Sequence, residues 1–363
     1  LLTGGVVALL SGFDVAVASR ESTVCVTGAS GYVASALINQ LLSATSPEGV
    51  PYKVVGTVRD ASKWQAERFF KDVQLFEADL LDASSFDAPF ALCGALMHTA
   101  SPFWLNFNPE TIATTVQGTE NVLRAAKKAG IRRVVVTGSC ASVTPQDPDA
   151  VPPVAGAGEP FTELDWNRDS TEQKGPYRLS KRLQEEKVWE FAAGEGLGGH
   201  YAVVNPSFII GPPALQRAEG ESVLFMKRML EGAYAKEGTP PAVMGVVDVR
   251  DVALAHIRAL ERDEANGKRF VLSSSRAYTW LELADFVRVH RNYGTNFALP
   301  TAVKGSIPKT RVRYSSKRAE EVLGVTLTPP ATSARDMADQ LLFTRMVNLD
   351  VAERRRNDPN AEL

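Results

Sequence analysis

The sequence predicts an α/β protein with a doubly wound parallel sheet and a smaller, mostly C-terminal lobe. Short apolar runs alternate with longer helical patterns between residues 22 and 210, which is typical of consecutive βαβ units. A glycine-rich turn follows the first apolar run, and the alternation becomes irregular beyond Gly211. The 363 residues are 44% hydrophobic and 23% charged, a composition that excludes a disordered, collagen-like or coiled-coil chain.

The order of apolar runs and helical patterns predicts the elements of the sheet. Strands are expected at 23–27, 52–58, 73–77, 95–99, 131–137 and 201–205. Helices are expected between them at 33–42, 110–128 and 176–193. Gly130 is placed to end the second helix in a left-handed C-cap, and Pro176 suits the first turn of the third. Right-handed crossovers complete the expected topology.

The chain outside these elements divides into further segments. Residues 1–21 are expected to form a disordered leader, with a remnant of a targeting peptide as the alternative. Asp14 and several glycines interrupt the apolar run of this leader, which argues against a membrane span. Residues 144–175 form a Pro- and Gly-rich insertion within the sheet domain, 22–210. The lobe is expected at 211–347, interleaved with the sheet, with helices near 222–231, 250–261, 279–289 and 331–346, and a polar tail at 348–363.

Composition and charge exclude several classes of function. Lys and Arg number 40 and Asp and Glu 42, so the net charge of −2 argues against a nucleic-acid binder. Cys25, Cys93 and Cys140 are too few and too scattered for a disulfide framework or a zinc site, which predicts a reducing compartment, the cytoplasm. The four histidines form no H-E-x-x-H pair, so we expect no metal. The expected partner is a small molecule, and the expected state is a monomer or a homodimer.

The turn Gly28-Ala29-Ser30-Gly31-Tyr32-Val33-Ala34 joins the first predicted strand to the first predicted helix. A helix N-terminus exposes unpaired N–H groups and a partial positive charge, so it holds phosphate. The first glycine permits the tight turn, the second lets the backbone approach a pyrophosphate, and the small residue at 34 lets the helix pack on the sheet. The turn therefore predicts a dinucleotide-binding sheet of the Rossmann type.

The end of the second strand indicates which dinucleotide is bound. An acidic residue at this place binds the ribose 2′-hydroxyl of NAD, whereas an arginine accommodates the 2′-phosphate of NADP. Arg59 directly follows Val58, and Lys63 comes four residues later. Asp60 remains an alternative ribose ligand. We expect NADP(H).

Tyr177 and Lys181 form a Y-x-x-x-K pattern on one face of the third predicted helix. A tyrosine has an ordinary pKa near 10, and a nearby ammonium lowers that pKa toward neutral pH. Such a phenol can give a proton to a carbonyl oxygen while hydride reaches the carbonyl carbon. A surface tyrosine beside a solvated lysine is the alternative interpretation.

Ser139 follows the fifth strand at the edge of the sheet where open α/β sheets bind their ligands. Its hydroxyl is a candidate to hold the substrate oxygen, with Ser142 and Cys140 as weaker candidates. Cys140 is better interpreted as a packing residue, since no basic group lies near it in the sequence. His98 ends the fourth strand and is interpreted as a structural histidine near the cofactor.

Eight motifs occur in an order that resembles the extended short-chain dehydrogenase/reductase family, in the branch of dihydroflavonol 4-reductases and aldehyde (methylglyoxal) reductases. They are TGASGYVAS (27–35), VRD (58–60), ADL (78–80), HTASP (98–102), TGSCASV (137–143), YRLSK (177–181), NPSFIIGP (205–212) and VDVRDVALAH (247–256). The resemblance spans about residues 22–345. It implies a Rossmann domain followed by a substrate-binding lobe.

The resemblance also implies roles for individual residues. Ser139, Tyr177 and Lys181 would form the catalytic triad, with Lys181 also binding the nicotinamide ribose. Cofactor contacts would come from Gly28, Ala29, Ser30, Gly31, Tyr32, Val33, Arg59, Lys63, Asp79, Leu80, Thr99, Ala100, Ser101, Tyr177, Lys181, Pro206, Ile209 and Ser222. Flavonoid reductases carry an asparagine after the serine motif, where this chain has Val143 and Thr144, so a flavonoid substrate is not expected.

The sequence therefore predicts an NADPH-dependent reductase of an aldehyde or ketone. The alternatives are an NAD(P)-dependent hydroxysteroid or sterol-type dehydrogenase and an NADP-sensing regulatory protein without catalysis. A nucleotide-sugar epimerase is disfavoured because such enzymes prefer an acidic residue where Arg59 stands.

Overall fold

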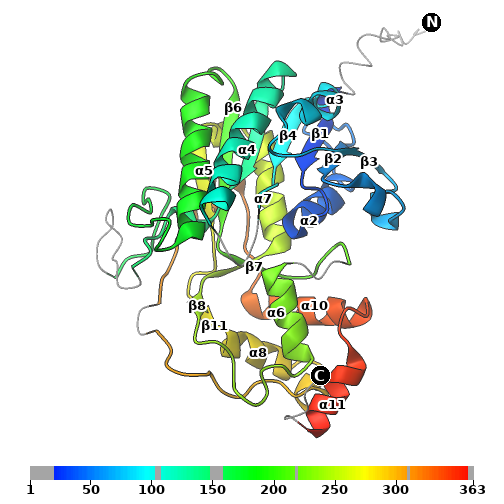
Figure 1. Cartoon of the computed structure of the whole chain (residues 1–363), viewed down its shortest axis with the longest axis vertical. Helices are drawn as coiled ribbons and strands as arrows, with labels where there is room; N and C mark the ends of the chain where they lie inside the picture. Colours follow the sequence, from blue (N-terminus) through cyan, green and yellow to red (C-terminus); the bar gives the residue numbers. More distant parts are fainter. Residues whose placement is uncertain (1–19, 103–107, 148–157, 217–219, 309–310, 359–363) are drawn as a thin grey trace, which may run out of the picture.

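A sheet of seven parallel strands forms the centre of the molecule, in the order β10-β6-β5-β4-β1-β2-β3 (Figure 1). The computed structural model describes residues 20–102, 108–147, 158–216, 220–308 and 311–358, so the leader expected at 1–21 lies almost wholly outside the described residues. The strands are β1 (Thr23–Thr27), β2 (Lys53–Val58), β3 (Val73–Glu77), β4 (Ala95–His98), β5 (Arg133–Thr137), β6 (His200–Pro206) and β10 (Lys268–Leu272). The fold class and the six expected strands are confirmed.

The strand β10 was not predicted. It pairs with β6 at one edge of the sheet and follows helix α7 (Val249–Glu261). Residues 249–272 therefore form the last α/β unit of the main sheet, although the sequence pattern places them inside the irregular C-terminal region. A single strand of five residues in that region does not extend the alternation of apolar runs and helical patterns by which the other strands were predicted.

Two pairs of helices cover the two faces of the sheet. Helices α2 (Tyr32–Leu41) and α7 share one hydrophobic core, and helices α4 (Pro109–Lys128) and α5 (Pro176–Ala193) share the other. Successive side chains of a strand point to opposite faces. Accordingly, Val24 and Val26 of β1 lie in the first core, and Cys25 lies in the second. Figure 1 shows α4 and α5 side by side on their face.

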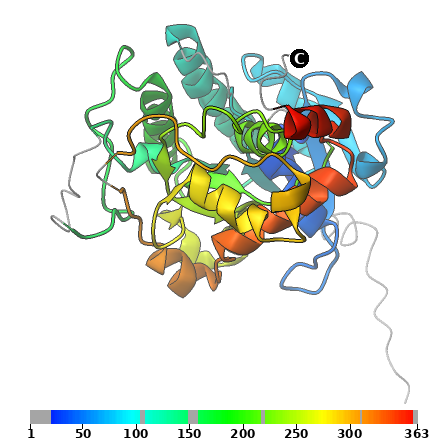
Figure 2. The same cartoon turned by 90° about the horizontal axis from the view of Figure 1, so that it is seen from below.

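The smaller lobe covers one end of the sheet, as the view from below shows (Figure 2). Its elements are β7 (Phe208–Ile210), α6 (Glu221–Leu230), β8 (Val243–Met244), β9 (Val246–Asp248), β11 (Tyr278–Thr279), α8 (Trp280–Arg288), α9 (Tyr293–Asn296) and α10 (Pro330–Phe343). Its core holds Phe225, whose ring stacks on Trp280 with centroids 3.4 Å apart. The tail expected from residue 348 contains a helix, α11 (Leu349–Asn357), capped by the side chain of Asn348.

A disulfide joins Cys25 of β1 to Cys93, which lies just before β4. The cysteine count alone predicted no disulfide framework, and this single bond was not foreseen. The two cysteines are 68 residues apart in the sequence, and only the crossover that places β4 beside β1 brings them together. The third cysteine, Cys140, is free and buried. The expected reducing compartment stays a prediction.

Membrane-spanning helices and metal-binding clusters are both absent from the described residues. No helix in that part of the chain is long and apolar enough to cross a membrane. Within the same residues, no group of His, Cys, Asp and Glu side chains is arranged to hold a metal ion.

His256 of α7 is fully buried against β5. Its Nδ1 donates to the carbonyl oxygen of Val252 at 2.8 Å, so its Nε2 accepts from the Thr137 hydroxyl at 2.7 Å. Burial lowers the pKa of His256 to about 4, because the imidazolium is poorly solvated there.

We expect acid to destabilise the fold partly through His256. The pKa is about 4 in the folded state, below the unfolded value of about 6.5. The unfolded chain therefore takes up this proton first as the pH falls, and the contribution of neutral His256 is lost from about pH 6.5 downward, by roughly 2 kcal/mol between about pH 7 and 5. Urea unfolding of wild type and His256→Gln at both pH values measures the difference. Equal losses in the two proteins would show that another group is responsible.

Candidate active site

The glycine turn lies between β1 and α2, at the carboxyl edge of the sheet. Gly28 has φ +66°, and a Cβ added there would lie 3.0 Å from the Cα of Ala100. Gly31 is the N-cap residue of α2, and as a glycine it has no side chain with which to cap the helix. A helix N-terminus of this kind can bind a phosphate group through its first N–H groups. Ala29, Ser30, Tyr32 and Val33 complete the turn.

Thr27 ties the glycine turn to the end of β4. Its hydroxyl oxygen accepts hydrogen bonds from the backbone N–H groups of Thr99 and Ala100, both at 3.1 Å. The Thr99 hydroxyl donates to the Thr27 carbonyl oxygen at 2.5 Å. The structure therefore brings the predicted residues Thr99, Ala100 and Ser101 beside the turn.

Arg59 follows β2 directly, and β2 pairs with β1, so Arg59 lies on the same edge as the glycine turn. Asp60, the alternative ribose ligand, is engaged locally: its carboxylate accepts from the Ser62 hydroxyl at 2.6 Å and pairs with the Lys63 ammonium at 3.2 Å. Both partners lower the pKa of Asp60. Asp60 and Lys63 are thus partners of each other, and the role of Arg59 stays a prediction.

Asp79 and Leu80 follow β3 and have local contacts. The Asp79 carboxylate accepts from the Leu81 N–H at 2.8 Å, and the Leu80 carbonyl oxygen accepts from the Asn121 amide at 2.8 Å. Leu80 also packs on Gly118 of α4. The structure thus shows both residues shaping the loop after β3, two strands away from the glycine turn.

Tyr32 connects the glycine turn to the smaller lobe. Its hydroxyl donates to the Gly211 carbonyl oxygen at 2.6 Å and also meets the Ser222 side chain at the start of α6. Pro206 is the last residue of β6, and Ile209 lies in β7. The predicted cofactor residues Pro206 and Ile209 therefore lie on the segment that leads from β6 into the lobe, and Ser222 lies beside Tyr32 of the glycine turn.

Ser139 and Tyr177 are brought together by two different elements. Ser139 leaves β5 and caps a short 3-10 helix, Cys140–Ser142, by accepting from the Ala141 N–H at 3.1 Å. Tyr177 lies in the first turn of α5, and its hydroxyl is 3.5 Å from the Ser139 hydroxyl oxygen. Both hydroxyls can therefore reach one substrate oxygen.

Arg178 contributes a positive charge that acts on the Tyr177 phenol. Burial raises the pKa of Tyr177, while the Ser139 hydroxyl and the positive charge of Arg178 lower it. Arg178 is held by the Thr144 hydroxyl at 2.7 Å. Lys181 donates to the Ser101 hydroxyl and the Gln184 amide oxygen, both at 3.0 Å, and its effect on the pKa of Tyr177 stays a prediction. Sequence reasoning missed Arg178, which stands next to Tyr177 in the chain.

Lys181 and His98 belong to one buried polar chain. Burial lowers the pKa of Lys181 to about 8. Gln184 continues the chain to the Thr119 hydroxyl at 3.3 Å, and that hydroxyl lies 3.5 Å from Nε2 of His98. The other ring nitrogen of His98 lies 2.8 Å from the Thr27 hydroxyl.

Burial also explains why His98 and Cys140 are structural. It lowers the pKa of His98 to about 3, so His98 stays neutral at ordinary pH. It raises the pKa of the Cys140 thiol, whose sulfur donates to the Asn205 carbonyl oxygen at 3.2 Å. A thiol kept protonated in this way packs and does not attack.

The chain belongs to the NAD dependent epimerase/dehydratase family, which matches residues 24–273. The resemblance to extended short-chain dehydrogenases/reductases is thereby confirmed. Cinnamoyl-CoA reductase CAD2 of Medicago truncatula is 32% identical over 339 residues, which cover 90% of this chain and 98% of that protein.

Two further relatives are fungal. The putative NADPH-dependent methylglyoxal reductase GRP2 of Candida albicans is 30% identical over 295 residues, 74% of this chain and 83% of that protein. The crystal structure of Gre2 from Candida albicans in complex with NADPH matches with a TM-score of 0.73 and 25% identity, over 88% of this chain and 98% of that one. The predicted branch and cofactor agree with these relatives.

Substitution at Gly28 is expected to impair both folding and cofactor binding. Gly28→Ala adds a Cβ at positive φ, which destabilises by about 1–2 kcal/mol, and the contact with Ala100 adds to that. Gly49→Ala is the matched control, since Gly49 has φ +78° but nothing within 4 Å of an added Cβ. Urea unfolding and NADPH fluorescence titration compare the two. Equal stability and unchanged NADPH affinity in Gly28→Ala would contradict the close approach of Ala100.

Proposed function

We propose that the protein reduces an aldehyde or ketone to an alcohol with NADPH, and that Tyr177 donates the proton. The observation that carries this proposal is the 3.5 Å separation between the Tyr177 and Ser139 hydroxyls at the edge of the sheet where the glycine turn lies. The names of the relatives support it: the Medicago truncatula protein and GRP2 are named reductases, GRP2 is named NADPH-dependent, and the Gre2 structure is a complex with NADPH.

The residues present fit an NADP cofactor. Gly28 and Gly31 form a cradle that a side chain would fill, and the uncapped N-terminus of α2 suits a pyrophosphate. Arg59 suits the 2′-phosphate, since Asp60 is engaged by Ser62 and Lys63. When bound, the cofactor supplies hydride to the carbonyl carbon.

The protein's own groups would act on the carbonyl oxygen. Ser139 and Tyr177 would both donate hydrogen bonds to this oxygen, which stabilises the negative charge that develops on it. Tyr177 would then transfer its proton, so the product leaves as an alcohol. Lys181, held by Ser101 and Gln184, is assigned to the ribose hydroxyls. NADPH consumption across aldehydes, diketones and ketoesters would identify the substrate.

Loss of the Tyr177 hydroxyl should abolish most of the activity. Tyr177→Phe removes the proton donor and is expected to lower kcat by about 100- to 10,000-fold, with NADPH affinity within about twofold of wild type. Tyr201→Phe is the control, because this buried tyrosine of β6 packs on Phe191 away from the site. Steady-state NADPH oxidation measures both. Turnover near the wild-type level in Tyr177→Phe would rule out this proton donor.

Arg59 should determine the preference for NADPH over NADH. A charge-assisted hydrogen bond contributes about 1.5–3 kcal/mol, so Arg59→Ala should raise KM for NADPH by about 10- to 100-fold and leave KM for NADH nearly unchanged. Lys71→Ala provides the control, since Lys71 is exposed and, among the described residues, forms an ion pair only with its neighbour Asp72. If Arg59→Ala keeps the wild-type KM for NADPH, another residue binds the 2′-phosphate.

A further inference from the structure

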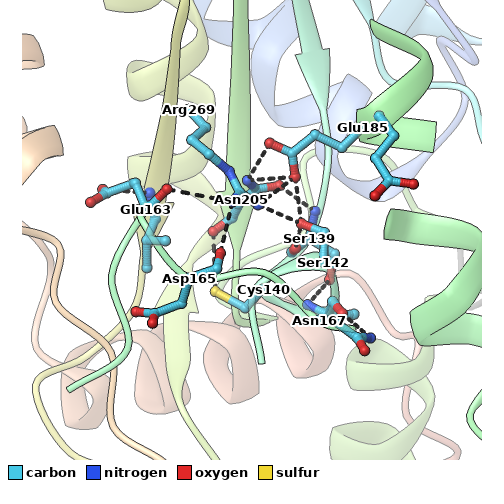
Figure 3. Close-up of polar contacts among 12 residues, drawn as sticks. Ser139, Cys140, Ser142, Glu163, Asp165, Asn167, Glu185, Asn205 and Arg269 are labelled. Carbon is cyan, nitrogen blue, oxygen red and sulfur yellow. Dashed lines mark hydrogen bonds and ion pairs between the residues drawn. The ribbon is translucent and has the colours of Figure 1, made fainter. Parts of the chain in front are cut away.

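A buried ion pair lies next to the loop after β5 that carries Ser139 and Ser142. Nη2 of Arg269 in β10 is 2.7 Å from Oε2 of Glu185 in α5, and the two side chains are 6% and 0% exposed (Figure 3). Removing two charges from water is unfavourable, and apolar replacements of such pairs are often at least as stable. The pair therefore calls for an explanation other than stability.

Glu185 binds groups from several elements at once. Oε2 lies 2.5 Å from the Ser142 hydroxyl oxygen, and the Asn205 amide nitrogen is 3.2 and 3.1 Å from the two carboxylate oxygens. The Trp189 indole nitrogen lies 3.3 Å from Oε1. One carboxylate thus gathers β10, β6, the loop after β5 and its own helix (Figure 3).

Asn205 connects Glu185 to Ser139 by hydrogen bonds. Because its amide nitrogen faces the carboxylate of Glu185, its amide oxygen is turned to accept from the Ser139 N–H, at 2.8 Å. A Cβ at Gly138 would lie 2.0 Å from that oxygen, so only glycine there permits the approach. Ser142 lies against the same loop, since its hydroxyl oxygen is 2.8 Å from the Ser139 carbonyl oxygen, and its single proton can go either to that oxygen or to Glu185.

The same carboxylate lies on the helix that carries the other reactive groups. Tyr177, Lys181 and Glu185 are spaced four residues apart along α5, which puts them on one face. Arg269 is fixed in turn by the Asp165 carbonyl oxygen at 2.8 Å and by the ring of Trp166, 3.7 Å from its Cζ. The carboxylate that holds the loop after β5 is therefore anchored on the helix that carries Tyr177.

We propose that Glu185 and Arg269 are a positioning pair, which holds the Ser139 hydroxyl at the distance from the Tyr177 hydroxyl that proton transfer requires. This inference rests on the proposed function, because it assigns the pair to that same reaction. Glu185 acts through Asn205 and Ser142, and Arg269 acts by orienting Glu185. Neither charge reaches the substrate in this arrangement.

Glu185→Gln tests the proposal, because it keeps the size of the side chain and leaves the Arg269 charge without its partner. We expect kcat to fall at least tenfold while KM for NADPH stays within about twofold, since the glycine turn and Arg59 lie on other elements. Glu186→Gln is the matched control. Glu186 is the next residue of α5, and it pairs on the outer face of the helix with Arg168 at 2.7 Å and Arg182 at 3.2 Å. Its kcat should equal that of wild type.

A double-mutant cycle separates positioning from general loss of structure. In a Ser139→Ala background, Glu185→Gln should change kcat less than threefold, because the group it positions is gone. An undiminished tenfold loss in that background would overturn the proposal, as would full activity of Glu185→Gln. If Tyr177→Phe itself kept wild-type turnover, the proposed function would fail instead, and the two failures are thus distinguishable.

Rescue with an apolar pair gives an independent readout. Replacing both residues, Glu185→Met with Arg269→Met, is expected to bring the thermal midpoint above that of Glu185→Gln, because no charge is left unpaired. A positioning role requires kcat to stay low in this double variant. Recovery of kcat together with the midpoint would show that the pair serves stability alone.

Discussion

The approach of the Tyr177 hydroxyl to the Ser139 hydroxyl is the constraint on which the candidate site depends. It requires the loop after β5 to lie beside the start of α5, and the 3-10 helix of that loop packs on α5. The end of β5 is held by β6, since Thr137 pairs with Val204 and the Gly138 N–H donates to the Val204 carbonyl oxygen at 2.8 Å. The glycine turn after β1 and the end of β4 lie on that same edge. One sheet edge thereby collects groups that are far apart in the sequence.

The sequence was sufficient for the parts of the fold that follow from local pattern. Alternating apolar runs located the six strands, because a buried strand and the helix after it each have their own periodicity. The pattern failed for β10, where Lys268 and Arg269 precede only a short apolar run. It also failed for the Cys25–Cys93 disulfide and the Glu185–Arg269 pair, since both are set by long-range packing that no local period encodes.

The candidate site shows the same division. The motifs identified Ser139, Tyr177 and Lys181, and the structure places them near one another. The helical spacing of Tyr177 and Lys181 predicted the face of α5 on which they lie, but it could not predict where the ammonium at the end of the lysine side chain would be. Lys181 turns to Ser101 and Gln184, whereas Arg178, one position from Tyr177, places its charge near the phenol. Helical spacing determines the direction in which each Cβ points. The hydrogen-bond partners within reach then determine where the charged end of a long side chain lies.

The electrostatics of Tyr177 bear on the direction of the proposed reaction. Burial raises the pKa of Tyr177, so the phenol holds its proton at neutral pH, which is the state that a proton donor to a carbonyl needs. Oxidation of an alcohol would need the opposite state, a phenolate formed before the substrate reacts. Ser139 and Arg178 partly offset the effect of burial, which keeps the proton transferable once negative charge develops on the substrate oxygen. The groups that stabilise the phenolate come from the loop after β5 and from the residue after Tyr177.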